Sequence, residues 1–177
     1  MTRQREGAEV ETITAENAAN PSPGQQTIIV QPNEGKILEA FGDTVQVKLS
    51  GLVTNGSFVL GFGTTPPGHG PPPHVHHRED ELFIVLEGTS RYLGENGWSE
   101  PVGPGGIAYT PRGVRHTFQN CGTTPGKHWV LATPSGFEKF FAQCAEVFAL
   151  GGAPHMQRII AIATEHGLEF VPPLIPV

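Results

Sequence analysis

Three histidines and one glutamate have the residue types and the spacing of a metal site. His74 and His76 lie two residues apart, Glu81 follows after four intervening residues, and His116 comes much later. Three imidazoles and one carboxylate suit Fe, Mn, Ni, Cu or Zn as divalent ions, and they leave one or two positions for water, oxygen or substrate. These ligand types do not choose among the five metals. We therefore predict one divalent transition metal per chain as the cofactor.

Short strands must position these side chains, because residues two apart on a strand share a face. His74 and His76 then point together into a barrel, while Val75 points out. Glu81 begins an apolar run. His116 begins a strand much later in the chain, and only a closed sheet brings that strand next to the other three ligands. Strands are predicted at residues 44–50, 57–63, 81–87, 91–93, 98–102, 106–110, 116–120 and 127–133, with glycine and proline between them. This pattern predicts an all-β sandwich or barrel.

Turn and helix signals complete the predicted elements. Asn55-Gly56 and Asn96-Gly97 stand between predicted strands, and both residues of Asn-Gly tolerate the positive φ of a two-residue hairpin turn. Ser135-x-x-Glu138 has the form of a capping box before a helix with apolar residues at Phe137, Phe140, Phe141, Cys144 and Phe148. A second helix is predicted over residues 154–166, ending at Gly167, with an apolar face of Met156, Ile159, Ile160 and Ala163. We expect the two helices to cover an open face of the barrel.

Length and composition indicate one domain with many turns. The chain has 177 residues, including 23 glycines and 17 prolines, and only 16% are charged, which favours an all-β fold over long charged helices. Residues 1–26 are polar without periodicity, and we expect a disordered or loosely attached arm. Residues 27–134 are predicted to form the barrel. Residues 135–177 are predicted to form a helical extension packed on it.

Charge and cysteine usage limit the partners and the compartment. The net charge of −6 gives no positive field for a nucleic acid or an anionic membrane, so neither is an expected partner. Residues 1–16 lack the apolar core of a secretory signal, and the apolar run at residues 82–86 is too short to cross a bilayer. Cys121 and Cys144 form no Cys-x-x-Cys motif. Two free cysteines predict a cytoplasmic location.

Glycines and a proline stand at fixed distances around the candidate ligands. In sequence order the ten fixed positions are Gly68, His74, His76, Glu81, Gly88, Gly105, Pro111, Gly113, His116 and Asn120. Their spacing matches both motifs of the cupin superfamily, which the chain resembles from residue 68 to residue 120. The resemblance implies a double-stranded β-helix, or jelly-roll, barrel. The complete ligand set favours a metal-binding cupin over a purely structural barrel.

The complete motifs, the single cupin unit and residues 133–141 together resemble the bacterial quercetinase-like monocupins. This resemblance implies a divalent transition metal and, in some members, oxygen-dependent ring cleavage of a flavonol. In those members the glutamate at the position of Glu81 serves both as ligand and as base toward the substrate hydroxyl. We carry this dual role to Glu81 as a hypothesis, which makes it the candidate catalytic residue.

Other titratable residues compete for these roles. Glu79 and Asp80 are alternatives to Glu81, but only Glu81 fits the motif spacing. His77 must face away from His76 on a regular strand, so we interpret it as exterior or as supporting a ligand from behind. The remaining histidines are interpreted as solvated: His69, His128, His155 and His166.

Strand parity also predicts the walls of a substrate pocket. If Glu81 faces inward, then Phe83 and Val85 do too, and if His116 faces inward, then Phe118 and Asn120 follow. Phe62 on the preceding strand extends this apolar wall or belongs to ordinary core. The predicted inward positions supply no lysine or arginine for a phosphorylated sugar. A small-molecule substrate that is neutral, flat or hydrophobic is therefore predicted.

Three classes of function fit these residues, and one assembly is expected. We favour a metal-dependent dioxygenase, with a metal-dependent isomerase or lyase and a non-catalytic binding module as alternatives. The outward residues Leu82, Ile84 and Leu86 need cover from the tail helices or from another subunit. Because cupins commonly pair through their sheets, we expect a homodimer.

Overall fold

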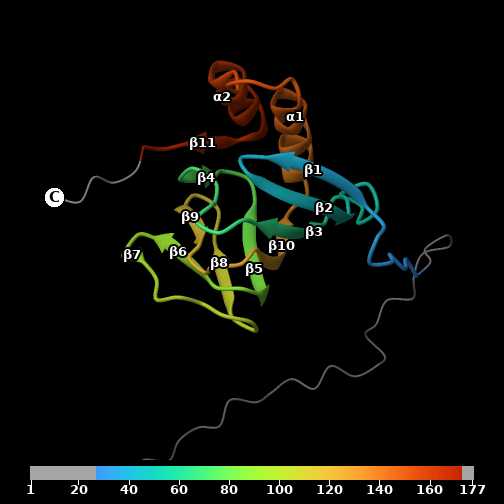
Figure 1. Ribbon diagram of the computed structural model, residues 1–177. Coiled ribbons are helices and arrows are strands. Elements are labelled where there is room, and N and C mark those ends of the chain that lie inside the picture. Colours follow the sequence, from blue (N-terminus) through green and yellow to red (C-terminus); the bar gives the residue numbers. More distant parts are fainter. Residues whose placement is uncertain (1–26, 173–177) are drawn as a thin grey trace, which may run out of the picture.

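The computed structural model describes residues 27–172, which form a barrel with two helices at one end (Figure 1). The predicted N-terminal arm, residues 1–26, lies outside the described residues. The barrel strands are β1 (Lys36–Ala40), β2 (Asp43–Leu49), β3 (Val59–Thr65), β4 (His74–His76), β5 (Asp80–Glu87), β6 (Ser90–Gly94), β7 (Gly97–Trp98), β8 (Ile107–Thr110), β9 (Arg115–Asn120) and β10 (Gly126–Thr133). After them come α1 (Phe137–Ala149), α2 (Met156–His166) and β11 (Leu168–Phe170).

Two antiparallel sheets make up the barrel. One has six strands in the order β1-β2-β3-β10-β5-β8, and the other has five in the order β11-β4-β9-β6-β7. The neighbouring strands β3, β10 and β5 are far apart in sequence, as a jelly roll requires. The predicted all-β jelly-roll fold with C-terminal helices is confirmed.

Alternation along the strands follows the predicted parity in β5 but not in β3. Glu81, Phe83 and Val85 are buried inside, while the residues between them are half-buried on the outer face. In β3 the buried positions are Val59, Gly61, Gly63 and Thr65. Phe62 therefore faces outward and packs edge-on against Trp129 of β10, with ring centroids 5.3 Å apart. The prediction that Phe62 lines the substrate pocket is wrong, because glycines occupy the inward face of β3 beside it.

The two Asn-Gly sequences form turns that differ from the predicted ones. Asn55 and Gly56 both have positive φ, at 52° and 82°, but they belong to a connection over residues 50–58 rather than a two-residue turn. Near Asn96, Gly94 pairs with Gly97. The two-residue turn is thus residues 95–96, one position earlier than predicted.

Both predicted helices are present, with changes in capping and orientation. The N-cap of α1 is Gly136 without a side-chain cap. The Glu138 carboxylate instead accepts hydrogen bonds from the N–H groups of Gly51 and Gly136, at 2.8 and 2.9 Å, so the predicted capping box does not form. In α2 the buried residues are Ile159, Ile162 and Ala163. Met156 and Ile160, which were predicted to be apolar contacts, are exposed.

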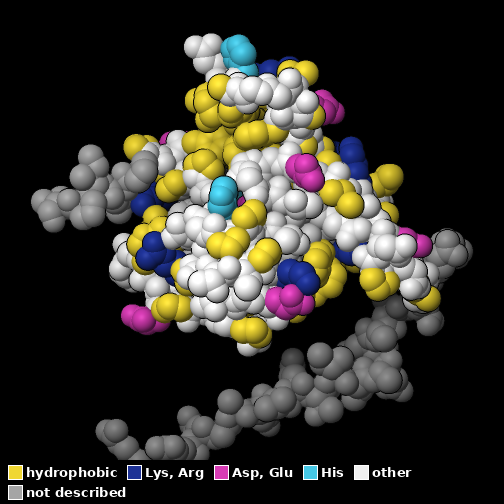
Figure 2. Space-filling model, in the orientation of Figure 1, with side chains coloured by type: hydrophobic (Ala, Val, Ile, Leu, Met, Phe, Trp, Pro, Cys, Tyr) yellow, Lys and Arg dark blue, Asp and Glu magenta, His cyan; other side chains and the backbone are white. Residues whose placement is uncertain are grey.

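The C-terminal segment supplies a strand as well as helices. β11 pairs antiparallel with β4, placing Leu168 beside His76 and Phe170 beside His74. α1 packs on β1, and α2 packs on α1 and β11. Figure 2 shows hydrophobic side chains gathered where the helices meet the barrel. The extension is therefore tied directly to the strand that carries two of the candidate ligands.

No helix within residues 27–172 is long and apolar enough to cross a membrane.

Candidate metal centre

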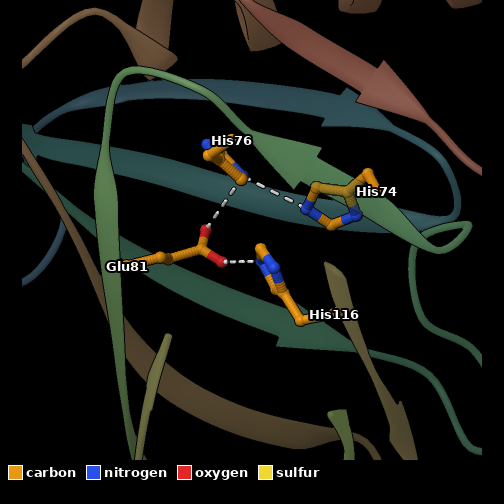
Figure 3. A group of neighbouring side chains, drawn as sticks. All are labelled: His74, His76, Glu81 and His116. Atoms are coloured by element: carbon orange, nitrogen blue, oxygen red, sulfur yellow. Dashed lines mark hydrogen bonds and ion pairs between the residues drawn. The ribbon is translucent and has the colours of Figure 1, made fainter. Parts of the chain in front are cut away.

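The four predicted ligands meet inside the barrel (Figure 3). His74 and His76 come from β4, Glu81 from β5 and His116 from β9, and all four side chains are buried. One nitrogen or oxygen atom of each lies within 4.8 Å of the others. The Glu81 carboxylate lies between two imidazoles, 3.0 Å from His116 Nε2 and 3.9 Å from His76 Nε2.

Backbone carbonyl groups orient two of the imidazoles. Nδ1 of His74 lies 2.8 Å from the carbonyl oxygen of Pro72, and Nδ1 of His116 lies 2.9 Å from that of Val114. Each carbonyl accepts the Nδ1 proton, which leaves Nε2 of a neutral His74 with a lone pair, whereas Nε2 of His116 donates to the Glu81 carboxylate at 3.0 Å. His74 Nε2 lies 3.1 Å from His76 Nε2. Three imidazole nitrogens and a carboxylate oxygen within 4.8 Å of one another can bind one cation together, so the residues fit a divalent metal.

The charge states of these groups also suit a metal. Burial opposes ionisation of Glu81, but the adjacent His76, His116 and His74 outweigh it and lower its pKa to about 2. Burial lowers the pKa of His74 to about 3, aided by repulsion from His76 and His116. Burial also opposes the charged form of His116, yet the hydrogen bond to Glu81 raises its pKa. The site therefore combines an anionic Glu81 with a neutral His74 at neutral pH, and a metal competes with a proton for His116.

A small apolar cavity adjoins the centre. It has a volume of about 50 Å³ and is lined by His74, Glu81 and His116 on one side. An engineered cavity of about 150 Å³ holds benzene, so this one admits only a few atoms without a movement of its walls. Phe83 and Phe118 line it as predicted, with ring centroids 5.0 Å apart.

Two other predicted wall residues face inward without reaching the cavity. Val85 is buried, but it is not one of the residues that line the cavity. Asn120 is also fully buried, and its side-chain amide donates hydrogen bonds to the carbonyl oxygens of Thr65 and Thr124 at 2.9 and 2.8 Å. The prediction that they line the pocket is wrong, because inward parity does not specify depth along the barrel. Asn120 joins the β3 and β9 ends of the barrel instead.

Five phenylalanines close the cavity from the side of the helices, and we call them the phenylalanine roof. They come from the β1–β2 turn, α1 and β11: Phe41, Phe137, Phe140, Phe141 and Phe170. The ring of Phe137 lies 5.2 Å from that of His76, measured between centroids. Sequence reasoning identified the α1 phenylalanines as an apolar helix face but missed their place over the metal centre, because their spacing does not reveal the surface that they cover.

His128 is a pocket residue that the sequence analysis interpreted as solvated. It is only 6% exposed, on the inner face of β10, with its ring 5.2 Å from that of Phe83 and 5.3 Å from that of Phe118. A side chain at the opposing Gly63 would collide with it. Burial lowers the pKa of His128 to about 4, against the attraction of Glu81. The sequence contained a signal for this position, because His128 alternates with Val130 and Ala132 on the inward face of β10.

Asp43 is a second buried polar residue of the cavity wall that was not predicted. Its side-chain Oδ1 has no hydrogen-bond partner within the described part of the chain. Burial raises its pKa to about 6, although Thr65 and His69 favour the charged form. It follows directly after the β1–β2 turn and shares the inward parity of Val45.

The alternative ligands lie outside the cluster. Asp80 is at the surface in an ion pair with Arg112, at 2.9 Å. His77 is exposed and pairs with Glu169 at 3.1 Å, so its predicted exterior position is confirmed. Glu79 is buried behind His76. Among the other histidines, His69 and His155 are exposed as predicted, whereas His166 is half-buried beside the ring of Phe140.

Comparison with known proteins agrees with the motifs and the fold. Residues 61–131, which include all four candidate ligands, match the family described as the cupin domain. These residues therefore carry the match to the cupin domain, and the fold around them is consistent with it. A germin-like protein from Mesembryanthemum crystallinum is 34% identical over 87 residues, which cover 44% of this chain and 37% of that protein. The chain thus spans little more than a third of the length of that relative.

Three solved structures illustrate the shared barrel. A predicted oxalate decarboxylase from Thermotoga maritima is 19% identical, with a TM-score of 0.55 over 60% of this chain and 99% of that chain. KdgF from Halomonas sp. is 15% identical, with a TM-score of 0.56 over 63% of this chain and 99% of that chain. The polyketide cyclase RemF from Streptomyces resistomycificus is 27% identical, with a TM-score of 0.54 over 62% of this chain and 81% of that chain. The first two likenesses concern the fold alone.

Proposed function

We propose that this cupin is a metal-dependent dioxygenase that acts on a small, neutral, apolar or aromatic substrate bearing an enol or phenol hydroxyl. The observation that carries the proposal is a cluster of three histidines and one glutamate beside an apolar cavity whose lining residues include no lysine or arginine. Such a cavity favours a neutral, flat molecule over a phosphorylated or carboxylated one. The resemblance of the sequence to quercetinase-like monocupins supports the same substrate class.

The mechanism assigns each side chain of the cavity a task. His74, His76, Glu81 and His116 would hold the metal, which supplies a Lewis acid and, when it is redox-active, a binding position for oxygen. Glu81 is ionised and lies at the cavity wall, so one of its carboxylate oxygens can accept the proton of the substrate hydroxyl. Removing that proton prepares an electron-rich substrate for oxygen.

The remaining walls orient the substrate and exclude water. Phe83 and Phe118 flank the space for a flat ring, and His128 offers an uncharged hydrogen-bonding group between them. Because the closed cavity is smaller than a benzene ring, an aromatic substrate requires displacement of the phenylalanine roof. Phe137, Phe140 and Phe141 lie on α1, outside both sheets, so this part of the roof can shift without opening the barrel, whereas Phe170 lies on β11, which pairs with β4.

Oxygen uptake tests this proposal directly. Protein loaded with Fe(II), Mn(II) or Ni(II) is mixed with flavonols and with smaller phenols or enols, and oxygen consumption and product mass are followed. We expect consumption with at least one neutral hydroxyl-bearing substrate, and none with Glu81→Gln protein that still carries metal. Conversion of a substrate without oxygen consumption would contradict the dioxygenase assignment.

A redox-neutral reaction is the second candidate, because the polyketide cyclase RemF is 27% identical over 62% of this chain. In an isomerase, lyase or cyclase the metal acts only as a Lewis acid. Zinc-loaded protein would then be as active as iron-loaded protein, without oxygen. Tight binding of a phenolic ligand without turnover by any loaded form would instead support a binding module.

We also propose that the protein is a homodimer that pairs through the outer face of the six-stranded sheet. Ile107 and Tyr109 of β8 are 61% and 60% exposed, beside the half-buried outer residues of β5. The helices pack on β1 at the other edge of this sheet, so they do not cover β5 and β8. Light scattering at micromolar concentration should give a dimer, and Ile107→Lys should give a monomer; a monomeric wild type would contradict the proposal.

We propose that neither nucleic acid nor a membrane is a partner and that the protein is located in the cytoplasm. The charge of −6 supports the prediction that neither nucleic acid nor membrane is a partner. Cys121 and Cys144 are both free, which supports the proposed cytoplasmic location.

A further inference from the structure

Glu79 is a buried carboxylate that the proposed mechanism does not use. Its side chain is 4% exposed, and its Oε2 lies 3.5 Å from Nδ1 of His76. Within the described residues neither of these two atoms has a hydrogen-bond partner. A side chain at Gly136, at the start of α1, would come within 3.1 Å of the other carboxylate oxygen. The glycine therefore leaves space for a buried acid behind a candidate metal ligand.

The support of His76 differs from that of the other two imidazoles. His74 and His116 each direct Nδ1 to a neutral carbonyl oxygen two residues earlier in the chain. His76 faces a carboxylate instead. A carboxylate behind a metal-binding imidazole fixes its tautomer and increases its basicity, which strengthens the bond to the metal.

The carboxylate behind His76 also affects the net charge of a metal-loaded centre. A divalent ion, one carboxylate ligand and three neutral imidazoles carry a net charge of +1. An unbalanced charge is costly next to a cavity lined mostly by apolar side chains. Glu79 contacts a candidate ligand directly and can supply a second negative charge, whereas Asp80 pairs with Arg112 at the surface and Asp43 lies across the cavity beside Thr65 and His69.

We propose that Glu79 is a positioning residue that makes the loaded centre electrically neutral, and thereby selects neutral hydroxyl-bearing ligands over anions. Its carboxylate holds His76 through Nδ1 and supplies the second negative charge. An anionic ligand then adds an uncompensated charge to the cavity, whereas a neutral ligand adds none. This inference rests on the metal centre of the proposed function and narrows its substrate class.

The experiment uses full-length protein loaded with Co(II), whose visible spectrum reports the ligands of the metal. Azide serves as the anionic probe and phenol as the neutral one. In Glu79→Gln protein we expect Co(II) affinity to fall by about 10–100-fold. We expect azide affinity to rise at least about tenfold, because the centre gains a positive charge. Phenol affinity should change much less than azide affinity.

Two further variants separate charge from packing. Glu79→Asp keeps the charge but shortens the side chain, so it should bind Co(II) more weakly while binding azide as the wild type does. Asp80→Asn removes the neighbouring surface carboxylate and should leave both affinities unchanged. Circular dichroism identifies any variant that fails to fold. If folded Glu79→Gln binds Co(II) and azide as the wild type does, Glu79 only fills space and the proposal is wrong.

The outcomes also separate this inference from the proposed reaction, because spectra of ligand binding require neither oxygen nor turnover. An increase in azide affinity without oxygen uptake in the wild type would support the role of Glu79 and contradict the dioxygenase. Failure of the wild type to bind Co(II) would contradict both proposals.

Discussion

The cavity has two walls that are built in different ways. The ligand wall consists of His74, His76, Glu81 and His116 on strands β4, β5 and β9. Hydrogen bonds to the i−2 carbonyl hold two of its imidazoles, and a nearby carboxylate lies behind the third. The opposite wall is the phenylalanine roof together with Phe118, His128 and Asp43. Its backbone lies partly on paired strands, but its phenylalanine side chains are held by ring packing and burial.

This difference separates two kinds of effect. The ligand wall sets the position of a metal and the net charge of the loaded centre, so single substitutions there should act on metal binding. The opposite wall sets the size and polarity of the space beside the metal. Substitutions there should act on ligand affinity and on stability while the metal stays bound.

The largest expected effect is loss of metal from His116→Ala. Four ligands share about 10–16 kcal/mol in structural zinc sites, so removing one should cost roughly 3 kcal/mol, or about 100-fold in affinity. Competition with a chromophoric chelator measures this change. His77→Ala is the matched control, because His77 is 52% exposed and pairs with Glu169. Full metal occupancy in His116→Ala protein would show that the ligand assignment is wrong.

Next in size is a pH-dependent gain in stability from Asp43→Asn on the opposite wall. The pKa of Asp43 is raised from 3.8 to about 6 by burial, so the folded state keeps a proton that the unfolded state loses. The resulting stability is present below pH 4 and is lost as the pH rises through 6, a loss of roughly 3 kcal/mol. Asp43→Asn should therefore be more stable than the wild type at pH 7.5, but not at pH 4.

Urea unfolding at these two pH values measures the Asp43 effect. Asp80→Asn is the control, since hydrogen bonds from Arg112 lower the pKa of Asp80 to about 2 and the expected change has the opposite sign. Equal stabilities of Asp43→Asn and the wild type at pH 7.5 would show that Asp43 is not strained by burial.

A smaller effect is expected from Phe118→Ala, which enlarges the cavity without touching the ligands. Phe118 packs against Phe83 and His128, and its loss should weaken binding of a flat aromatic ligand by about 1 to 3 kcal/mol. Metal content should stay the same. Titration of flavonols and smaller phenols into both proteins measures the change. Equal affinities would place the aromatic ligand away from this wall.

The smallest effect is the decline of metal affinity with falling pH. The hydrogen bond from His116 to Glu81 raises the pKa of His116, so a proton competes with the metal even above pH 6.5. As the pH falls below the pKa of His116, affinity should fall about tenfold per unit for one displaced proton. Zinc titrations between pH 6 and 8 test this slope. A constant affinity across that range would show that His116 binds no competing proton.

The sequence alone determined the ligand wall and the all-β fold. Strand alternation places residues two apart on one face, and glycines with a proline at fixed distances specify the turns that present His116 and Glu81. These relations are local and visible without coordinates, and the resemblance to the two cupin motifs joined His116 to the other three ligands. The same reasoning correctly placed Phe83 and Phe118 inside and His77 outside.

Tertiary structure decided the rest of the cavity. Phe62 faces outward. Val85 and Asn120 face inward without lining the cavity, because parity gives the face of a strand but not the position of a residue along the barrel. The pairing of β10 with both β3 and β5 brought His128 inside. The pairing of β11 with β4 carried the α1 phenylalanines over the metal centre. These contacts join segments that are far apart in the sequence, so no spacing within one segment specifies them.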